Sequence, residues 1–188
     1  MAPTGEQYDA IVIGVGGMGS AACYHLASRG RQVLGIERFG IPHARGSSHG
    51  ESRIIRKANY ECAAVVPILE RAYELWDELS ATTATPLRTQ TGYAAIGPDG
   101  AHVPKGAAEA CQAHGLAHEA MTGATFCDRY PGYDVPAEFT VVLEADGGFL
   151  RPEQCTISHV HAAYQQGAEI HTRERVHGWR ESGDGGVV

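Results

Sequence analysis

The chain has 188 residues, of which 43% are hydrophobic and 20% charged, a composition typical of a globular protein with a buried core. Its 15 basic and 22 acidic residues give a net charge of −7, and no basic run covers a face, which argues against nucleic acid or an anionic membrane as a partner. No apolar stretch is long enough to span a membrane, and the five cysteines have neither zinc nor disulfide spacing. We therefore expect no metal site and a reducing compartment.

The first 37 residues predict a strand, a helix and a second, parallel strand. Residues 8–13 form a β-branched apolar run that stops at Gly14, a helix is expected from about 17 to 28, and residues 31–37 form the next strand. The handedness of such a βαβ unit is strongly constrained, and its helix packs on the sheet. The sequence therefore predicts an α/β fold that begins with a parallel sheet.

The turn between this strand and helix carries a dinucleotide-binding fingerprint. Gly14, Gly16 and Gly19 form G-x-G-x-x-G, and Glu37 ends the second strand. The first glycine permits a tight turn, the second lets the backbone approach a pyrophosphate, and the third lets helix and strand pack closely. Glu37 is expected to accept hydrogen bonds from a ribose diol and to repel a 2′-phosphate, which argues against NADP. Because FAD and NAD share the fingerprint, both stay open, as does a structural glycine-rich turn without nucleotide.

The remaining chain alternates between helices and strands. Residues 41–52 have no usable period and predict an ordered loop, and residues 65–79 predict an amphipathic helix with Pro67 in its first turn. Further strands are expected at residues 91–96, 139–145, 149–150 and 168–172, and further helices at residues 105–114, 125–130 and 152–166. Residues 176–188 look like a hairpin whose second strand has barely begun, so we expect the N-terminal part of a longer protein, or a truncated product.

The loop after the βαβ unit carries a second motif. Residues 41–57 read Ile-Pro-His-Ala-Arg-Gly-Ser-Ser-His-Gly-Glu-Ser-Arg-Ile-Ile-Arg-Lys. This segment resembles a stretch of the FAD-dependent amine oxidase family that contains monomeric sarcosine oxidase, N-methyl-L-tryptophan oxidase and peroxisomal sarcosine (pipecolate) oxidase. The resemblance continues through residues 74–79, 91–92, 129–131 and 148–153. It covers the whole chain, which corresponds to about the first half of a family member.

The resemblance implies roles for residues of both motifs. Arg56 matches the arginine that holds the substrate carboxylate, and His49 and Arg53 match positions that supply hydrogen bonds and positive charge to a reduced flavin. A solvated basic patch is the alternative explanation of the two arginines. Val176 aligns with a backbone contact to the adenine. The residues expected to bind the cofactor are Gly14, Val15, Gly16, Gly17, Met18, Gly19, Glu37, Arg38, Ser47, Ser48, His49, Gly50, Arg53 and Val176.

The resemblance also implies an architecture. We expect an α/β protein in which a Rossmann-like FAD-binding βαβ domain is interleaved with an α+β substrate domain and is incomplete at its C-terminus. Residues 1–80 are expected to form the first part of the FAD-binding domain and residues 81–165 the first part of the substrate domain. Residues 166–188 are expected to return to the FAD-binding domain.

The implied activity is oxidation of the C–N bond of a small secondary or N-methyl amino acid to an imine, with reduction of O₂ to H₂O₂. In family members the second half carries the flavin-linking cysteine, the oxygen-activating lysine and a second basic residue for the carboxylate. The resemblance therefore implies that the remaining half of the oxidase fold is absent from this chain, and we expect little activity from residues 1–188 alone. Two alternatives stay open: a non-catalytic FAD- or nucleotide-binding fragment, and an NAD-dependent dehydrogenase domain. The expected compartment is cytoplasmic or peroxisomal.

Overall fold

The computed structural model describes residues 7–183 and 185–188, which form two compact units. Unit 1 contains the described residues up to 52 together with 79–85 and those from 151 onward, and unit 2 contains residues 53–78 and 86–150. Each unit is therefore assembled from segments that are distant in sequence. The bounds of the units differ from those expected for the functional domains, and the functional division at residues 80 and 165 stays a prediction.

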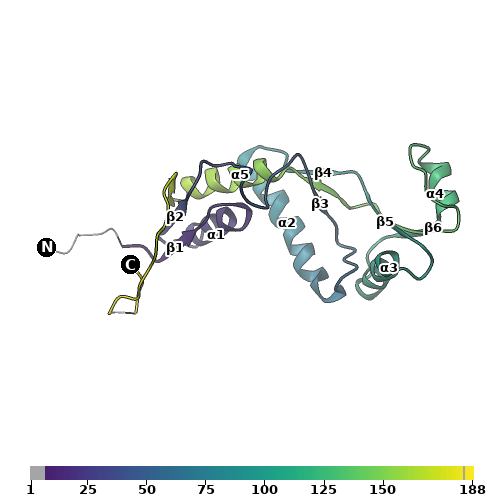
Figure 1. The fold of residues 1–188 in the computed structure, drawn as a ribbon, viewed down its shortest axis with the longest axis horizontal. Coiled ribbons are helices and arrows are strands. Elements are labelled where there is room, and N and C mark those ends of the chain that lie inside the picture. The colour runs from purple at the N-terminus through teal and green to yellow at the C-terminus, as the bar shows by residue number, and fades with distance from the viewer. Residues whose placement is uncertain (1–6, 184) are drawn as a thin grey trace. The chain divides into compact units, whose positions relative to one another are not determined.

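Unit 1 is built on a parallel sheet with the strand order β1 (Ala10–Ile13), β2 (Val33–Glu37), β9 (Glu169–Thr172) (Figure 1). The helix α1 (Gly17–Ala27) connects β1 to β2 and packs against α5 (Pro152–Gln165). This arrangement is a βαβ unit with a third parallel strand beside it. The predicted α/β fold with a parallel sheet is confirmed.

The core of unit 1 lies between the sheet and these two helices. Small and β-branched side chains dominate it, which lets the helices approach the strands closely. Its buried members are Val15, Cys23, Ala27, Val33, Ala163, Ala168 and Ile170. Because side chains alternate across a strand, the residues between these core positions point to the other face of the sheet.

Unit 2 contains two small antiparallel sheets. In the first, β8 (Gly148–Leu150) lies between β3 (Arg53–Ile55) and β4 (Arg88–Gln90). The second has the order β5-β7-β6, and its strands are Tyr93–Gly97 (β5), Glu119–Thr122 (β6) and Thr140–Glu144 (β7). The short strands β3, β4 and β6 were not predicted, because three or four residues with polar members carry too little alternation to show a period.

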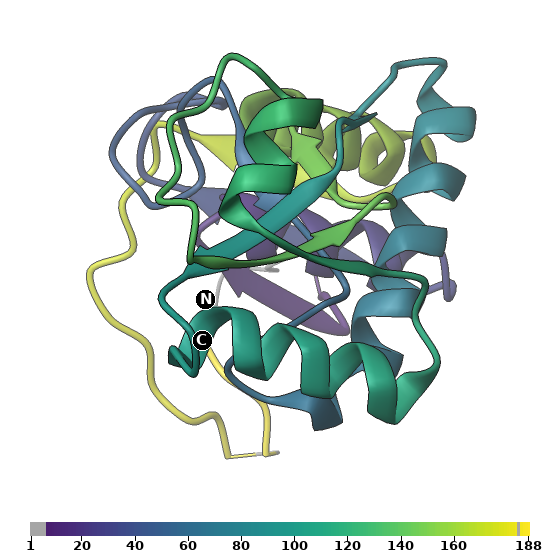
Figure 2. The same ribbon diagram turned by 90° about the vertical axis from the view of Figure 1, so that its right-hand side faces the viewer.

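Helices cover both faces of the β5-β7-β6 sheet. The helix α3 (His102–His114) packs on the face that carries Ala95 and Val142, whereas the short helix α4 (Gly123–Arg129) lies on the opposite face with Ala94 (Figure 2). The prediction of a helix near residues 105–114 is confirmed, with three more residues at its start. Its C-cap Gly115 has φ +66°, the left-handed conformation that favours glycine at this position.

The long helix α2 (Val66–Thr83) follows a 3₁₀ turn, η1 (Ala63–Val65), and its residues belong to both units. Pro67 lies in the first turn of α2, as predicted, where its missing N–H costs no helical hydrogen bond. The hairpin expected over residues 176–188 is reduced to a single antiparallel bridge. Arg180 and Val188 exchange backbone hydrogen bonds of 2.8 and 2.9 Å, next to the isolated bridge between Glu181 and Val187.

Candidate functional site

The glycine loop between β1 and α1 has the backbone geometry that its sequence requires. Gly14 adopts φ +88°, a left-handed conformation that allows the chain to leave β1 in a tight turn. A Cβ atom on Gly19 would lie 1.8 Å from the carbonyl oxygen of Gly14, so only glycine permits this approach of α1 to the loop. Gly16, the N-cap of α1, has no such neighbour within 4 Å and is open on its outer side. The loop therefore leaves room for a ligand at the start of the helix.

Glu37 ends β2 and is 5% exposed. One carboxylate oxygen, Oε2, accepts a 2.9 Å hydrogen bond from the backbone N–H of Val15. The other oxygen, Oε1, accepts a 2.9 Å bond from the N–H of Phe39 and lies 3.2 Å from Nε2 of His43. Glu37 thus ties the glycine loop to the chain that leaves β2. His43 could not be assigned to this site from the sequence, because nothing in its spacing from Glu37 distinguishes it from other loop histidines.

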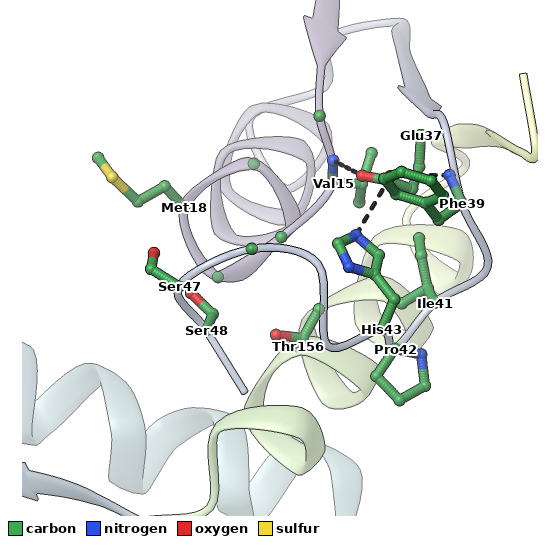
Figure 3. A pocket seen from close by; sticks show the side chains of 15 residues that line it. Val15, Met18, Glu37, Phe39, Ile41, Pro42, His43, Ser47, Ser48 and Thr156 are labelled. Atoms are coloured by element: carbon green, nitrogen blue, oxygen red, sulfur yellow. Dashed lines mark hydrogen bonds and ion pairs between the residues drawn. The ribbon is translucent and has the colours of Figure 1, made fainter. Parts of the chain in front are cut away.

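A pocket of about 340 Å³ opens beside the glycine loop, entirely within unit 1 (Figure 3). This volume lies in the range of roughly 300–1,000 Å³ typical of small-molecule sites. Glu37 and the His43 ring form part of its wall, and Thr156 of α5 lies across from the loop. The Met18 side chain is 89% exposed and points away from the pocket (Figure 3). The pocket is lined by Gly14, Val15, Gly16, Gly17, Met18, Gly19, Glu37, Phe39, Ile41, Pro42, His43, Gly46, Ser47, Ser48 and Thr156.

A second cavity in unit 1 shares Gly14 and Glu37 with the first and reaches Val176 and Arg38. Hydrogen bonds hold the chain after β9 in this place, because the Glu174 N–H donates to the Glu37 carbonyl oxygen over 3.0 Å. The structure thus brings Val176 and Arg38 next to the glycine fingerprint. Val176 had been expected here from the resemblance alone.

The loop at residues 47–50 packs on the start of α1. A Cβ atom on Gly17 would lie 2.5 Å from the Ser48 Oγ, which shows how closely the loop follows the helix. The N–H of Gly50 donates a 2.7 Å hydrogen bond to Oε1 of Glu153 in the first turn of α5. His49 stands between these two anchors and is partly buried. The anchors therefore position the loop that the resemblance assigns to the flavin.

Arg53 and Arg56 of the second motif belong to unit 2. Arg53 begins β3, opposite Leu150 of β8, and Arg56 follows the end of β3. The Arg56 guanidinium lies over the rings of Tyr60 and Tyr93, at 4.9 and 5.3 Å from their centroids. Its Nε is buried and has no hydrogen-bond partner within the described part of the chain. Arg56 therefore carries a buried donor that the described residues leave unsatisfied.

A buried carboxylate fixes the chain immediately after Arg56. Glu144 of β7 is 2% exposed, and its oxygens accept hydrogen bonds from the N–H groups of Lys57 and Ala58 at 2.8 to 3.1 Å. Glu144 also faces Tyr93 across the β5-β7 pair. Burial raises the pKa of the Tyr93 phenol, which therefore stays neutral beside Arg56. An acid at the end of an apolar strand is the signal that could have identified Glu144.

The five cysteines carry no disulfide, and three of them are buried. Burial raises the pKa of the Cys155 thiol to about 12 and that of Cys111 to about 11, which is the behaviour of inert core thiols. Within residues 7–183 and 185–188, no group of three histidine, cysteine or acidic side chains is arranged to hold a metal ion. None of the helices in the described chain has the length and apolar character needed to cross a membrane.

The βαβ unit and its glycine-rich turn have the arrangement of a dinucleotide-binding fold, and comparison with known proteins gives the family. The family profile described as DAO, FAD dependent oxidoreductase, matches residues 9–188. The chain therefore belongs to this family of FAD-dependent oxidoreductases, and the resemblance found in the sequence is confirmed.

Two groups of relatives give the particular branch. Monomeric sarcosine oxidase from Streptomyces avermitilis is 40% identical over 185 residues, which cover 98% of this chain and 47% of that protein. N-methyl-L-tryptophan oxidase from Yersinia pestis is 36% identical, over 87% of this chain and 44% of that protein. The chain is thus sarcosine oxidase-like and spans about half the length of the curated relatives it matches.

Solved structures show the same fold. NikD, described as an unusual amino acid oxidase essential for nikkomycin biosynthesis, has a TM-score of 0.83 at 24% identity, over 97% of this chain and 47% of that one. L-proline dehydrogenase from P. horikoshii has a TM-score of 0.80 at 24% identity, over 95% and 47%. The expected α/β fold with a Rossmann-like βαβ unit is confirmed, and the structure also contains antiparallel sheets.

Proposed function

We propose that this chain is the FAD-binding half of an oxidase that acts on small secondary or N-methyl amino acids. The reaction oxidises the substrate C–N bond to an imine and reduces O₂ to H₂O₂. The observation that carries the proposal is the unit 1 pocket, in which the glycine fingerprint and Glu37 meet. The family membership supports FAD over NAD as the dinucleotide. The five free cysteines agree with a reducing compartment, cytoplasmic or peroxisomal in this proposal.

The residues of the pocket fit the adenosine diphosphate portion of FAD. Gly16 is open on its outer side, and the first N–H groups of α1 have no helical acceptor, so a pyrophosphate can approach them. The N–H of Val15 is used by Glu37, so we assign phosphate binding to the residues after it. Bound FAD would supply the two-electron acceptor of the reaction. The protein's own task is to hold the cofactor and to orient the amine.

We assign the substrate carboxylate to Arg56. Its guanidinium lies over two tyrosine rings and carries the planar fork of N–H donors that binds a carboxylate. The ion pair with Glu61 is long, at 3.5 Å, and Glu61 is 61% exposed, so this pair contributes little and can be replaced. His49 and Arg53 are assigned to the flavin on the resemblance alone.

A non-catalytic nucleotide-binding fragment is the second candidate. It is favoured by the coverage of the relatives, since the chain spans 47% of the Streptomyces avermitilis protein. Under either candidate the chain binds FAD. The two differ in whether a complementary half completes a catalytic site.

In the first test the purified chain is titrated with FAD, FMN and NAD. Binding is monitored by flavin fluorescence or calorimetry. We expect binding of FAD and weaker binding of FMN, which lacks the adenosine portion. Gly16→Ala should weaken FAD binding by placing a methyl group where the pyrophosphate approaches, whereas Gly132→Ala, also at an open site but in unit 2, should not. A chain that binds no FAD would contradict the proposal.

Activity separates the two candidates. The chain alone should release no H₂O₂ with sarcosine or pipecolate, because the family's second half is needed to complete the site. Addition or fusion of the second half of a relative should produce turnover if the chain is part of an oxidase. Robust turnover by the chain alone would contradict the proposal that the family's second half is needed to complete the catalytic site.

A further inference from the structure

A histidine that the proposed function does not use lies beside Glu37 in the unit 1 pocket. His43 comes from the loop after β2, and its ring points to the Glu37 carboxylate with Nε2 at 3.2 Å from Oε1 (Figure 3). The two side chains are only 19% and 6% exposed. This pair therefore forms a shielded part of the wall where the ribose of a nucleotide is expected.

The hydrogen bond at Nδ1 determines which nitrogen of the His43 ring carries the proton. The N–H of Arg45 donates to Nδ1 over 3.0 Å, so Nδ1 acts as the acceptor and carries no proton. In a neutral imidazole the proton is then on Nε2, the nitrogen that lies 3.2 Å from Oε1 of Glu37. The Phe39 ring meets the His43 ring edge-on, with the centroids 5.1 Å apart. These contacts hold the imidazole in a single orientation.

The acceptor capacity of Glu37 is therefore nearly used up. A carboxylate offers about four lone-pair positions, two on each oxygen. Oε1 accepts from the Phe39 N–H and lies 3.2 Å from Nε2 of His43, which covers its second lone pair, and Oε2 accepts from the Val15 N–H. One position remains, and it is on Oε2.

We propose that His43 is a specificity-determining residue of the nucleotide site. By occupying the second lone pair of Oε1, it leaves Glu37 a single acceptor position, so the carboxylate recognises one hydroxyl of an adenosine ribose instead of both. This inference rests on the proposed nucleotide site, and it adds a residue and a selectivity that the glycine fingerprint does not contain.

The experiment measures the binding of ADP, 2′-deoxy-ADP and 3′-deoxy-ADP to the purified chain by calorimetry. For the unmodified chain, one deoxy analogue should bind about tenfold more weakly than ADP, because it lacks a hydrogen bond to a charged group, and the other should bind nearly as well as ADP. For His43→Leu, Oε1 gains an open position, so both analogues should bind more weakly than ADP by similar factors.

Two further variants serve as controls. His43→Gln keeps an N–H donor on a side chain of similar reach and should restore the selectivity of the unmodified chain. His114→Leu removes an exposed histidine at the end of α3 in unit 2 and should leave all three affinities unchanged.

The outcomes distinguish a failure of the proposed role of His43 from a failure of the proposed nucleotide site. If the unmodified chain binds ADP but loses equal affinity for both analogues, or if His43→Leu keeps the original selectivity, the role of His43 is overturned and the nucleotide site stands. Tighter ADP binding by His43→Leu with unchanged selectivity would show that the imidazole only competes with the ligand, and it also overturns the role. A chain that binds none of the three nucleotides overturns the nucleotide site and this inference together.

Discussion

Gly19 shows how a single missing side chain positions the site. The Gly14 carbonyl oxygen occupies the space where a Cβ atom of Gly19 would lie, at 1.8 Å. This contact brings the start of α1 against the glycine loop and so places the helix N-terminus at the pocket. Gly16 belongs to the same motif but is open on its outer side. Two glycines of one fingerprint therefore serve packing and ligand access separately.

Substitution should separate these two roles. Gly19→Ala should lower the free energy of unfolding by about 3 kcal/mol, because the helix must move away from a backbone atom that cannot yield. Gly16→Ala, with φ −83°, should stay within about 0.5 kcal/mol of the unmodified chain. Urea denaturation, monitored by circular dichroism, measures the free energy of unfolding of both variants. Equal stability of the two variants would contradict the assigned packing role.

At the scale of elements, Glu144 joins β7 to the segment after β3. Its carboxylate is the acceptor for the N–H groups of Lys57 and Ala58, and Ala58 is completely buried. The bonds span 86 and 87 positions of the sequence. The buried carboxylate thus supplies the hydrogen-bond acceptors that a neighbouring strand would supply at a sheet edge. By binding these backbone N–H groups it also fixes the position of Arg56.

Removal of this acceptor should destabilise unit 2. Glu144→Leu leaves the two N–H groups without their partner and should cost about 3 kcal/mol of the free energy of unfolding. Glu119→Leu, at an exposed position of the neighbouring strand β6, should cost less than about 1 kcal/mol. Urea unfolding provides the comparison, and a neutral Glu144→Leu would show that the buried acid is dispensable.

The packing of α1 on α5 contains a titratable group. His159 of α5 is 6% exposed and lies near Tyr24 and His25 of α1, with ring centroids 5.9 and 6.1 Å apart. Burial, reinforced by the His25 charge, lowers the pKa of His159 to about 4. The folded state therefore holds a neutral imidazole that the unfolded chain would protonate at mildly acidic pH.

The consequence is a loss of stability on acidification. Because the folded pKa of His159 lies below its ordinary value of 6.5, the unfolded state binds more protons between these values. Stability is fully present above pH 6.5 and falls by roughly 3 kcal/mol as the pH drops toward 4. The measurement is the slope of the free energy of unfolding against pH. This slope should be flatter for His159→Leu than for the unmodified chain, and His161→Leu serves as an exposed control on the same helix. Identical slopes in all three proteins would count against the buried neutral histidine.

At the scale of the whole molecule, the parallel sheet of unit 1 has an apolar second face. The helices α1 and α5 pack on one face, and the other presents Ile11 and Ile13, which are 40% and 58% exposed. A cavity on this face is lined by Ile11, Ile13, Ile36, Val176, Gly178, Trp179, Val187 and Val188. Parallel sheets are normally covered on both faces. The described chain therefore exposes a surface with the character of a core.

This face should bind apolar probes. The purified chain is expected to enhance the fluorescence of the dye ANS, and Ile13→Lys should reduce that enhancement by placing a charge on the face. Ile68→Lys is the matched control, because Ile68 is 70% exposed on α2 and belongs to unit 2. The same dye signal from both variants would show that the face is not the binding surface.

Much of unit 1 followed from local sequence. The β1-α1-β2 unit and the glycine turn were predicted because apolar periodicity, glycine position and a terminal acid are all read within some 30 residues. The helix at Pro152 was likewise marked by a proline in its first turn. The short strands and the reduced bridge near Val187 could not be predicted, since their pairing depends on partners elsewhere in the chain.

The sequence by itself determined the family, the parallel sheet and the place of the nucleotide fingerprint, because these depend on short-range patterns that one βαβ unit contains. Only the tertiary structure decided which groups surround the predicted residues. The Glu37 carboxylate meets His43, Arg56 lies between Tyr60 and Tyr93, and Glu144 holds the following segment. These contacts join loops and strands whose spacing has no period. They form only when the folded backbone brings buried polar groups together and each must find a partner.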